Sequence, residues 1–599
     1  MKSPGHVLIA MYCCSSGVSH PLTRVEPNNW TGLDRFVLTN RTIIENTYIF
    51  LIAFCMVLSK RRIHCEGGNK GMNEALVQNT ALLGYLPSLL LITVALLAAV
   101  NLLRSVDLTF QLGRLIGIGS LLLLLGIGMV VLTSGPMVSP IIGSGEIGLQ
   151  IRFDALSVLL SWLVILLGTL LIQFSRNYLD GDPRQKVFFL RLYLTIGAVL
   201  LMILAGNLWQ LVLAWIGTSL ALHELLVFYP ERPRAIRAAR KKFIVARVGD
   251  LCLIVAAVLL SQDFGTTDIG AIRDAAINAL ASGNIPNSAA TAAILIAIAA
   301  SLKSAMFPFH GWLLEVMETP TPVSALLHAG LLNAGIFLVV RFGEVVFLST
   351  PALIFLIVIG GFTALFASSS MITQSSVKVS LAYSSAAHMA FMLMLCGFGA
   401  HTVAIMHLIA HSCYKAHAFL SSGSIIEYVR NTGVQRLDKV PHPLALLANI
   451  ALATAIFLAV ATAMGIDLTK RPAETAMVTI FMIAVAYLIV KGNTGRVPLY
   501  VISRTTAMAI LVTVAFFVLE VLAEALLGRA VAVYPTLNPP VLIVVWVAVA
   551  VFAVVVILSA YLPALVNRPA WRAFYVHLKN GFYANTLFDR LLDTLRLAR

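Results

Sequence analysis

Long apolar segments run through almost the whole of this 599-residue sequence and limit the chain to one class of fold. Hydrophobic residues make up 59% of the chain and charged residues only 12%, about half of the share that a soluble protein carries. A helix needs roughly 20 apolar residues to cross the hydrocarbon core of a bilayer. The sequence therefore predicts an all-α, polytopic membrane protein whose surroundings are membrane lipid.

We count fifteen candidate transmembrane helices, with boundaries known to within several residues. They cover approximately 83–103, 115–134, 155–175, 187–206, 207–229, 243–262, 289–313, 320–341, 350–373, 377–398, 401–429, 443–465, 475–491, 502–527 and 541–565.

The basic residues predict an orientation for these helices. The loop after the fifth helix is rich in arginine and lysine, from Arg232 to Lys242, and such loops favour the cytoplasm. The acidic loop 263–288 then lies on the opposite side. An odd number of helices places the N-terminus in the periplasm and the basic C-terminal tail in the cytoplasm of a cell with an inner membrane.

Several classes of function are excluded by what the sequence lacks. The net charge of +15 does not indicate nucleic-acid binding, because the basic residues lie in short loops without interleaved aromatic residues. The seven cysteines form no C-x-x-C pair, so the sequence gives no support for a structural metal. It also has no glycine-rich nucleotide motif. We therefore expect no cofactor, no metal and no nucleic-acid partner.

The seventh candidate helix carries a lysine in its middle. Ionisable side chains at membrane depth cost at least ~2.5 kcal/mol and persist mostly where they pair, line water or do chemistry. Lys303 lies in this helix, and Pro308 follows five residues later and should break it. Broken helices at membrane depth usually line a cavity. Because burial disfavours the charged form of lysine, Lys303 is a candidate proton carrier; a fixed structural ion pair is the alternative.

The eighth candidate helix begins at Pro320 and Pro322 and carries His328 among small residues. Proline is tolerated in the first turn of a helix. A lone buried histidine is commonly a core residue, but the proximity of Lys303 in the sequence makes a functional role an equal alternative.

The eleventh candidate helix carries three titratable groups on one face. His407, His411 and Lys415 are spaced four residues apart, which places successive side chains about 6 Å apart. Such a row predicts a relay that passes protons through intervening water. A zinc site is the alternative, since histidines at this spacing suit zinc, but the adjacent lysine opposes a metal cation.

Further ionisable residues lie near helix ends and are possible accessory groups. His223 and Glu224 lie near the inner end of the fifth helix, and Arg247 and Asp250 form an i, i+3 pair at the start of the sixth. We expect Arg247 and Asp250 to pair, for a structural or a functional reason. Lys378 begins the tenth helix and could extend to the inner surface.

These residues lie in segments that resemble a known family. The segment SLKSAMFPFHGWLLEVMETPTPVSALLHAGLLNAG resembles the antiporter-like subunits of respiratory complex I and of multisubunit sodium–proton antiporters, and FIVARVGD, VKVSLAYSS and HLIAHSCYKAHAFLSSGS match further blocks. The resemblance covers about residues 150–430, with a weaker similarity in the tail. It implies that Lys303, His328, His407, His411 and Lys415 form a proton route.

The resemblance also implies a domain organisation. It predicts two inverted five-helix repeats, at 187–349 and 350–491, preceded by three transmembrane helices at 72–186 and followed by C-terminal helices and a cytoplasmic tail at 492–599.

Two departures from the family pattern stand out. The family's fifth helix has a glutamate directly after a tryptophan, as a partner for the buried lysine, whereas Ile216 occupies that place here. His223 or Glu224 could substitute for it. The buried lysine of the family's twelfth helix is also missing, since NIALATAIFLAVATAMG has no ionisable residue.

The segments HSCYKAHAFLSSGS and LLHAGLLNAG most resemble the membrane subunits of DAB-type inorganic carbon pumps, the DabB family. That resemblance implies a subunit that conducts H⁺ or Na⁺ and drives a soluble, zinc-containing, carbonic-anhydrase-like partner of the DabA type. The chain itself would then not be an enzyme. A proton-pumping subunit of a complex I-type NADH:quinone oxidoreductase or a cation/proton antiporter is one alternative, and a non-conducting membrane anchor is another. The absence of a carboxylate cluster favours H⁺ over Na⁺.

Residues 1–71 do not fit the pattern of the rest of the chain. They are polar, with one short apolar stretch near 47–58 that would leave Lys60, Arg61 and Arg62 outside if it crossed the membrane. No charged start and cleavage site flank this stretch as in a signal peptide. We therefore interpret residues 1–71 as an N-terminal extension and expect the functional chain to begin near Met72.

This expectation can be checked on the natively expressed protein. Intact-mass measurement or N-terminal sequencing should give a chain that starts near Met72. Peptides from positions before Met72 in the native protein would contradict the expectation.

Overall fold

The computed structural model describes most of the chain after the N-terminal extension. The described residues are 80–144, 147–423, 440–466, 472–493, 498–528, 530–532, 537–565 and 568–594. The expected extension 1–71 and the expected start at Met72 therefore lie outside the described residues.

The described chain is built almost entirely from helices. In chain order these are η1 Leu82–Gly84, α4 Tyr85–Ala99, α5 Val106–Ser134, α6 Ala155–Tyr178, α7 Gln185–Ile203, α8 Leu208–Leu226, α9 Pro233–Phe264, α10 Ile269–Ser282, α11 Asn287–Lys303, α12 Gly311–Glu315, η2 Val316–Glu318, α13 Thr321–Ala329, η3 Leu331–Asn333, α14 Ala334–Arg341, α15 Gly343–Phe347, α16 Thr350–Ile372, α17 Val377–Gly397, α18 His401–Leu420, α20 Pro443–Ala463, α21 Pro472–Gly492, α22 Leu499–Leu527, α23 Pro539–Ala560, α24 Leu562–Leu565, α25 Pro569–Lys579, η4 Gly581–Tyr583 and α26 Ala584–Thr594. Four short strands pair as two antiparallel ribbons, β1 Met137–Val138 with β4 Arg152–Phe153 and β2 Ile142–Ser144 with β3 Ile147–Leu149.

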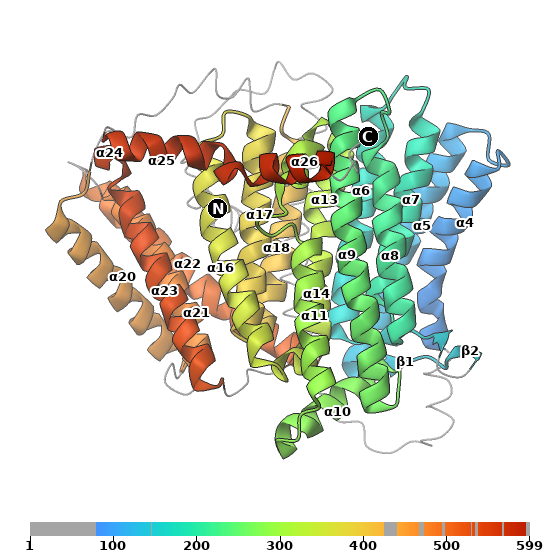
Figure 1. The fold of residues 1–599 in the computed structure, drawn as a ribbon, viewed down its shortest axis with the longest axis horizontal. Coiled ribbons are helices and arrows are strands. Elements are labelled where there is room, and N and C mark those ends of the chain that lie inside the picture. Colours follow the sequence, from blue (N-terminus) through green and yellow to red (C-terminus); the bar gives the residue numbers. More distant parts are fainter. Residues whose placement is uncertain are drawn as a thin grey trace.

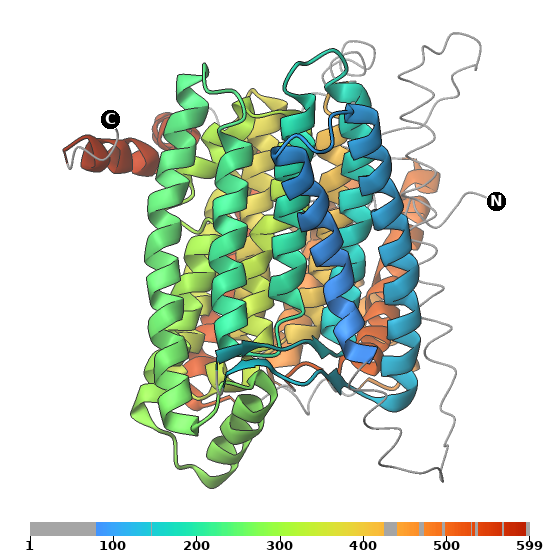
Figure 2. The ribbon, with the colours of Figure 1, turned by 90° about the vertical axis from the view of Figure 1, so that its right-hand side faces the viewer.

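The long helices stand side by side in one upright bundle (Figure 1). Exposed arginines lie where α8 is joined to α9, with Arg232 in the loop and Arg234 and Arg237 in the first turns of α9. We call this end of the bundle the basic end. Helix α10 and the strands lie at the opposite end, which we call the far end (Figure 2). Helices α25 and α26 run across the bundle near the basic end rather than along it.

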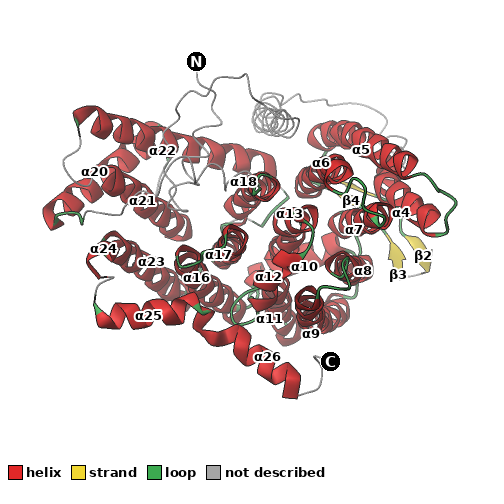
Figure 3. Cartoon of the chain, turned by 90° about the horizontal axis from the view of Figure 1, so that it is seen from above, coloured by secondary structure: helices red, strands yellow, loops and turns green. Residues whose placement is uncertain are grey.

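Seen along the bundle, the helices form two groups. Helices α4 to α9 lie on one side and α16 to α18 with α20 to α23 on the other, and α11, α12 and α13 lie between them (Figure 3). The short helices α12 and α13 therefore occupy the interior, where both groups can contact them.

The predicted all-α, polytopic fold is confirmed. Among the described residues, twelve helices are long and apolar enough to cross a membrane. The expected ranges 207–229, 289–313 and 401–429 are not among these twelve; they coincide with α8, α11 and α18, which run beside the others in the bundle. The count of fifteen transmembrane helices and the two inverted repeats stay predictions.

Local sequence signals explain where several helices begin. Asp154 caps α6 in a reciprocal arrangement with Ser157, and Ser105 accepts from the Leu108 amide at the start of α5. Such side chains satisfy backbone amides that have no partner within the first turn of a helix. Pro233 opens α9 in the first turn, where its missing N–H costs nothing.

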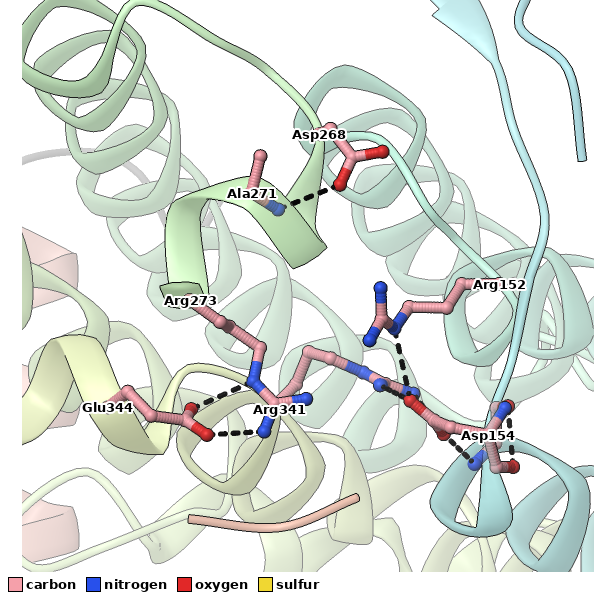
Figure 4. A network of polar contacts seen from close by, with 8 residues as sticks. Arg152, Asp154, Asp268, Ala271, Arg273, Arg341 and Glu344 are labelled. Carbon is pink, nitrogen blue, oxygen red and sulfur yellow. Dashed lines mark hydrogen bonds and ion pairs between the residues drawn. The ribbon is translucent and has the colours of Figure 1, made fainter. Parts of the chain in front are cut away.

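A buried network of charges joins several elements at the far end (Figure 4). The guanidinium of Arg341, at the end of α14, binds the carboxylate of Asp154, and both side chains are almost completely buried, at 0% and 1% exposure. Arg152 also contacts Asp154, with Nε 3.3 Å from Oδ2. Beside them Arg273 of α10 binds Glu344 of α15, with Nε 2.9 Å from Oε2. None of these pairs was expected from the sequence.

The surroundings of Asp154 favour its charged form. Burial by itself would raise the pKa of this carboxyl, but Arg341 and then Arg152 outweigh that effect and hold the pKa well below its usual range. Because the pKa in the folded state is lowered, the ion pair stabilises the fold fully above the usual pKa of aspartate, near 3.9. That stabilisation is lost as the pH falls below this value toward the folded-state pKa.

We predict that Asp154→Asn destabilises the protein by about 3–5 kcal/mol, because it leaves buried arginine charge without its counter-charge. Thermal unfolding in detergent should show this loss between pH 5 and 8, and the difference from the wild type should shrink below about pH 4.

The matched control is Asp180→Asn, which removes the exposed pair of Arg176 with Asp180, whose side chain is 76% exposed. It should cost less than about 1 kcal/mol. Equal losses in the two variants would contradict a special role for the buried pair.

Candidate functional site

Lys303 is the last residue of α11, half-buried in the interior of the bundle. Its ammonium nitrogen lies 4.3 Å from the centre of a Trp215 ring and 3.5 Å from the Trp215 carbonyl oxygen. An aromatic face attracts a cation through its quadrupole. Helix α8 therefore gives Lys303 a neutral, electron-rich contact through Trp215. This residue directly precedes Ile216, where the resemblance implies a glutamate.

The chain leaves helical geometry directly after Lys303 and resumes it at Gly311, where α12 begins. Pro308 lies within this segment, and proline can neither donate an amide hydrogen bond nor continue the preceding turn. Side chains and backbone groups of the segment bond to neighbouring elements instead: Ser304 Oγ donates to the Leu332 carbonyl, and the Phe307 amide donates to Thr363 Oγ1 of α16. Such bonds allow a broken helix at membrane depth.

The carboxylate that acts electrostatically on Lys303 is Asp250 of α9. Asp250 is buried and pairs with Arg247, with Nη2 2.7 Å from Oδ2. The expected pairing of these two residues is thus confirmed. Ile216 occupies the place on α8 where the resemblance implies a glutamate, and the carboxylate whose charge acts on Lys303 belongs to α9.

His223 and Glu224 lie further toward the basic end of α8 and have other neighbours. Glu224 is 56% exposed and pairs with Arg191 of α7 at 2.9 Å. The His223 ring packs against Phe243, with ring centres 5.3 Å apart. The contacts of Glu224 and His223 are therefore with Arg191 and Phe243, whereas the charge of Asp250 acts on Lys303.

A second cluster lies on α18 and α17. His407, His411 and Lys415 share one face of α18, as their spacing predicts, and His388 of α17 faces them. His388 Nδ1 lies 3.0 Å from His407 Nε2, and the His388 and His411 ring centres are 5.3 Å apart. His388 thus bonds to His407 and packs against the ring of His411. Among the described residues, no group of three or more His, Cys, Asp or Glu side chains could hold a metal ion.

His388 was not singled out from the sequence, although the signal was present. It lies in SSAAHMAFML, an apolar stretch in the middle of the tenth candidate helix. The criterion that selected His328, an ionisable residue at membrane depth, applies to it equally. Only its packing against α18 distinguishes it from an ordinary core histidine.

Lys415 and His328 lie at the junction of α18 with α13. Lys415 is fully buried, and its ammonium donates to the Leu381 carbonyl of α17 at 3.1 Å. The buried His328 ring stacks on Phe419, with ring centres 4.4 Å apart, and the charge of Lys415 acts on it. His328 thus contacts the helix that carries the second cluster.

A second irregular segment lies between the two clusters. Helix α13 ends at Ala329, and Gly330 and η3 follow before α14 begins. There Asn333 Nδ2 donates to Ser412 Oγ of α18 at 2.7 Å and to the Ala329 carbonyl at 2.9 Å. The preceding residue, Leu332, accepts the bond from Ser304. Polar bonds therefore connect the break after Lys303 with the residue next to His411.

Lys378 is half-buried and has a hydrogen-bond partner on another helix. Its ammonium donates to Thr321 Oγ1, at the start of α13, at 3.3 Å. The expectation that it reaches the inner surface stays a prediction. Lys378 ties the first turn of α17 to α13.

The interior therefore contains lysine and histidine side chains whose contacts are mostly with neutral groups. Lysine and histidine side chains can each bind and release a proton, and hydroxyl and amide groups between them can accept and donate hydrogen bonds. With intervening water, such a row can pass protons stepwise.

Comparison with known proteins agrees with this architecture. The family described as "NADH:quinone oxidoreductase/Mrp antiporter, TM" matches residues 205–490, and "NADH-Ubiquinone oxidoreductase (complex I), chain 5 N-terminus" matches residues 140–189.

Two relatives carry names that refer to inorganic carbon. The "probable inorganic carbon transporter subunit DabB2" of Halothiobacillus neapolitanus is 37% identical over 75% of this chain and 81% of its own length. The "probable inorganic carbon transporter subunit DabB" of Hydrogenovibrio crunogenus is 42% identical over 47% of this chain and 54% of its own length.

Among solved structures, a chain of the Mrp complex from Dietzia sp. has a similar fold. The TM-score is 0.53 at 22% identity, over 85% of this chain and 60% of the other. At this identity the likeness concerns the fold alone.

Proposed function

The chain belongs to the family of antiporter-like membrane subunits that includes the DabB-type subunits, and we propose that it conducts a cation, H⁺, across the inner membrane. The observation that carries the proposal is the set of titratable and polar groups gathered in the interior. It comprises Lys303, on which the charge of Asp250 acts, the Asn333–Ser412 hydrogen bond, and the histidines of α17 and α18.

In this proposal the group around Lys303 and the cluster on α17 and α18 are two parts of one route. Lys303 would serve the first expected repeat. The second repeat would be served by His388, His407, His411 and Lys415. His328 would lie between them, since it stacks on α18 and belongs to α13. The basic end would face the cytoplasm, in agreement with the preference of arginine-rich loops.

We further propose that the cation flow drives inorganic carbon uptake. The two relatives named above are called inorganic carbon transporter subunits. The partner would be a soluble, zinc-containing, carbonic-anhydrase-like subunit of the DabA type, which converts CO₂ to bicarbonate. The chemistry would then take place in the partner chain, driven by the cation flow down its gradient through this chain.

We predict that Lys303→Ala and His411→Ala abolish inorganic carbon uptake. Each removes a titratable group from the interior, and loss of a proton-transfer group typically costs at least about 100-fold in rate. The measurement is growth at ambient CO₂ of a carbonic-anhydrase-deficient host that expresses the chain with its soluble partner.

The matched control is Lys186→Ala, which removes a lysine at the start of α7 that donates to Asn101 and lies outside the route. It should rescue growth like the wild type. Co-purification of the partner must show that all variants assemble. Wild-type growth of both site variants would refute the route, and failure of a well-expressed wild-type complex to rescue would refute the carbon-uptake function.

One observation favours a non-conducting anchor as the second candidate. Helix α20 is continuous and carries no ionisable residue, so the family's twelfth-helix lysine has no substitute within it. Proton flux into liposomes that contain the purified complex separates the candidates. An anchor would give the flux of empty liposomes, and a conductor would give flux that Lys303→Ala removes.

A further inference from the structure

Lys242 of α9 is a buried lysine that the proposed route does not use. Its side chain is only 4% exposed, and its ammonium donates to the carbonyl oxygen of Ser219 at 2.6 Å and to the hydroxyl oxygen of Ser219 at 2.9 Å. Both acceptors are neutral. Burying an ammonium without a carboxylate in contact is costly. A buried lysine in such surroundings suggests a functional role.

The adjacent residue, Lys241, is a buried lysine whose charge is balanced by carboxylates. Lys241 is equally buried, but its ammonium lies 2.8 Å from Glu315 of α12 and 2.5 Å from Asp589 of α26. Asn585 of α26 completes this arrangement and also donates to Glu315. Lys241 therefore braces the C-terminal helix against the broken helix as a fixed cation, and Lys242 has a different environment.

Helix α8 places Lys242 next to Lys303. The carbonyl of Trp215 faces Lys303, and Ser219, four residues later, binds Lys242. Residues four apart lie on one face of a helix, about 6 Å apart along its axis. The two ammonium groups therefore occupy successive turns of the same face of α8, with Lys242 nearer the basic end.

Other charged groups connect the two lysines. Lys303, Arg247 and Asp250 act electrostatically on Lys242. Arg247 Nη2 lies 3.3 Å from Ser219 Oγ, the hydroxyl that Lys242 also binds, and pairs with Asp250. One carboxylate thus faces three cationic side chains in this region, so the protonation of one lysine opposes the protonation of the other.

We infer that Lys242 and Lys303 form a coupled lysine pair that shares protons, with Lys242 as the proton carrier on the basic-end side of Lys303. The inference rests on the proposed function, because it adds a step to the same route. In each step one proton leaves one ammonium and reaches the neutral amine of the other, through the Ser219 hydroxyl or water. When a proton arrives at Lys242, its positive charge favours the release of a proton from Lys303. In this way the lysine pair takes the role of the lysine–glutamate pair that the family resemblance implies.

The test measures proton flux in liposomes that contain the purified complex with its partner. Lys242→Met keeps the length of the side chain but removes the titratable group, and we expect it to lower the flux at least about 100-fold. Lys242→Arg keeps the positive charge but cannot release a proton, so we expect it to be equally inactive. Lys186→Met is the matched control and should keep the wild-type flux.

The arginine variant separates a proton carrier from a structural cation. Wild-type flux in Lys242→Arg, or flux within about twofold of the wild type in Lys242→Met, would overturn the inference. If Lys242→Met does not assemble, Lys242→Arg decides the question. Absence of flux in the wild type would instead overturn the proposed function, and loss of flux in Lys303→Ala but not in the Lys242 variants would overturn only the coupled pair.

Discussion

The interior of this bundle depends on one constraint: a charged or polar group inside the hydrocarbon region must find a partner within the protein. The far-end network meets this constraint with opposite charges, as Arg341 with Asp154. The candidate route meets it differently. Its three interior lysines, the buried Lys242 and Lys415 and the half-buried Lys303, contact backbone carbonyl oxygens, those of Ser219, Leu381 and Trp215 respectively. A neutral acceptor stabilises an ammonium less than a carboxylate does, so these lysines can lose a proton at lower cost.

Breaks in the helices make this arrangement possible. The break after Lys303 lets Ser304 donate to Leu332, and the irregular segment around Gly330 lets Asn333 donate to Ser412. In a continuous helix a backbone carbonyl such as that of Leu332 would be bonded to an amide of the next turn. The C-terminal helix α26 supports the first break from outside, since its Asn585 and Asp589 bind Lys241 and Glu315. The tail is thus part of the structure that positions Lys303.

The sequence predicted what depends on spacing along one helix, and it did not predict what depends on contact between helices. The membrane fold, the shared face of His407, His411 and Lys415 and the Arg247–Asp250 pair all follow from local spacing. The contact of His388 with His407, the action of Asp250 on Lys303 and the position of Lys242 against Ser219 do not. They depend on how α9, α17 and α18 pack, and no periodicity within one helix encodes that packing.

The balance of charge in the interior bears on which cation the route suits. Near Lys303 a sodium ion would meet Lys242, Arg247 and Lys303 itself, and among the described residues Asp250 is the carboxylate whose charge acts on both lysines. Sodium needs oxygen ligands and cannot discharge a lysine, so this repulsion would remain along its path. A proton avoids the problem, because each lysine that releases its proton becomes neutral before the next one arrives. The replacement of the family's glutamate by Ile216, which removes negative charge from this region, is therefore compatible with proton transfer and unfavourable for sodium.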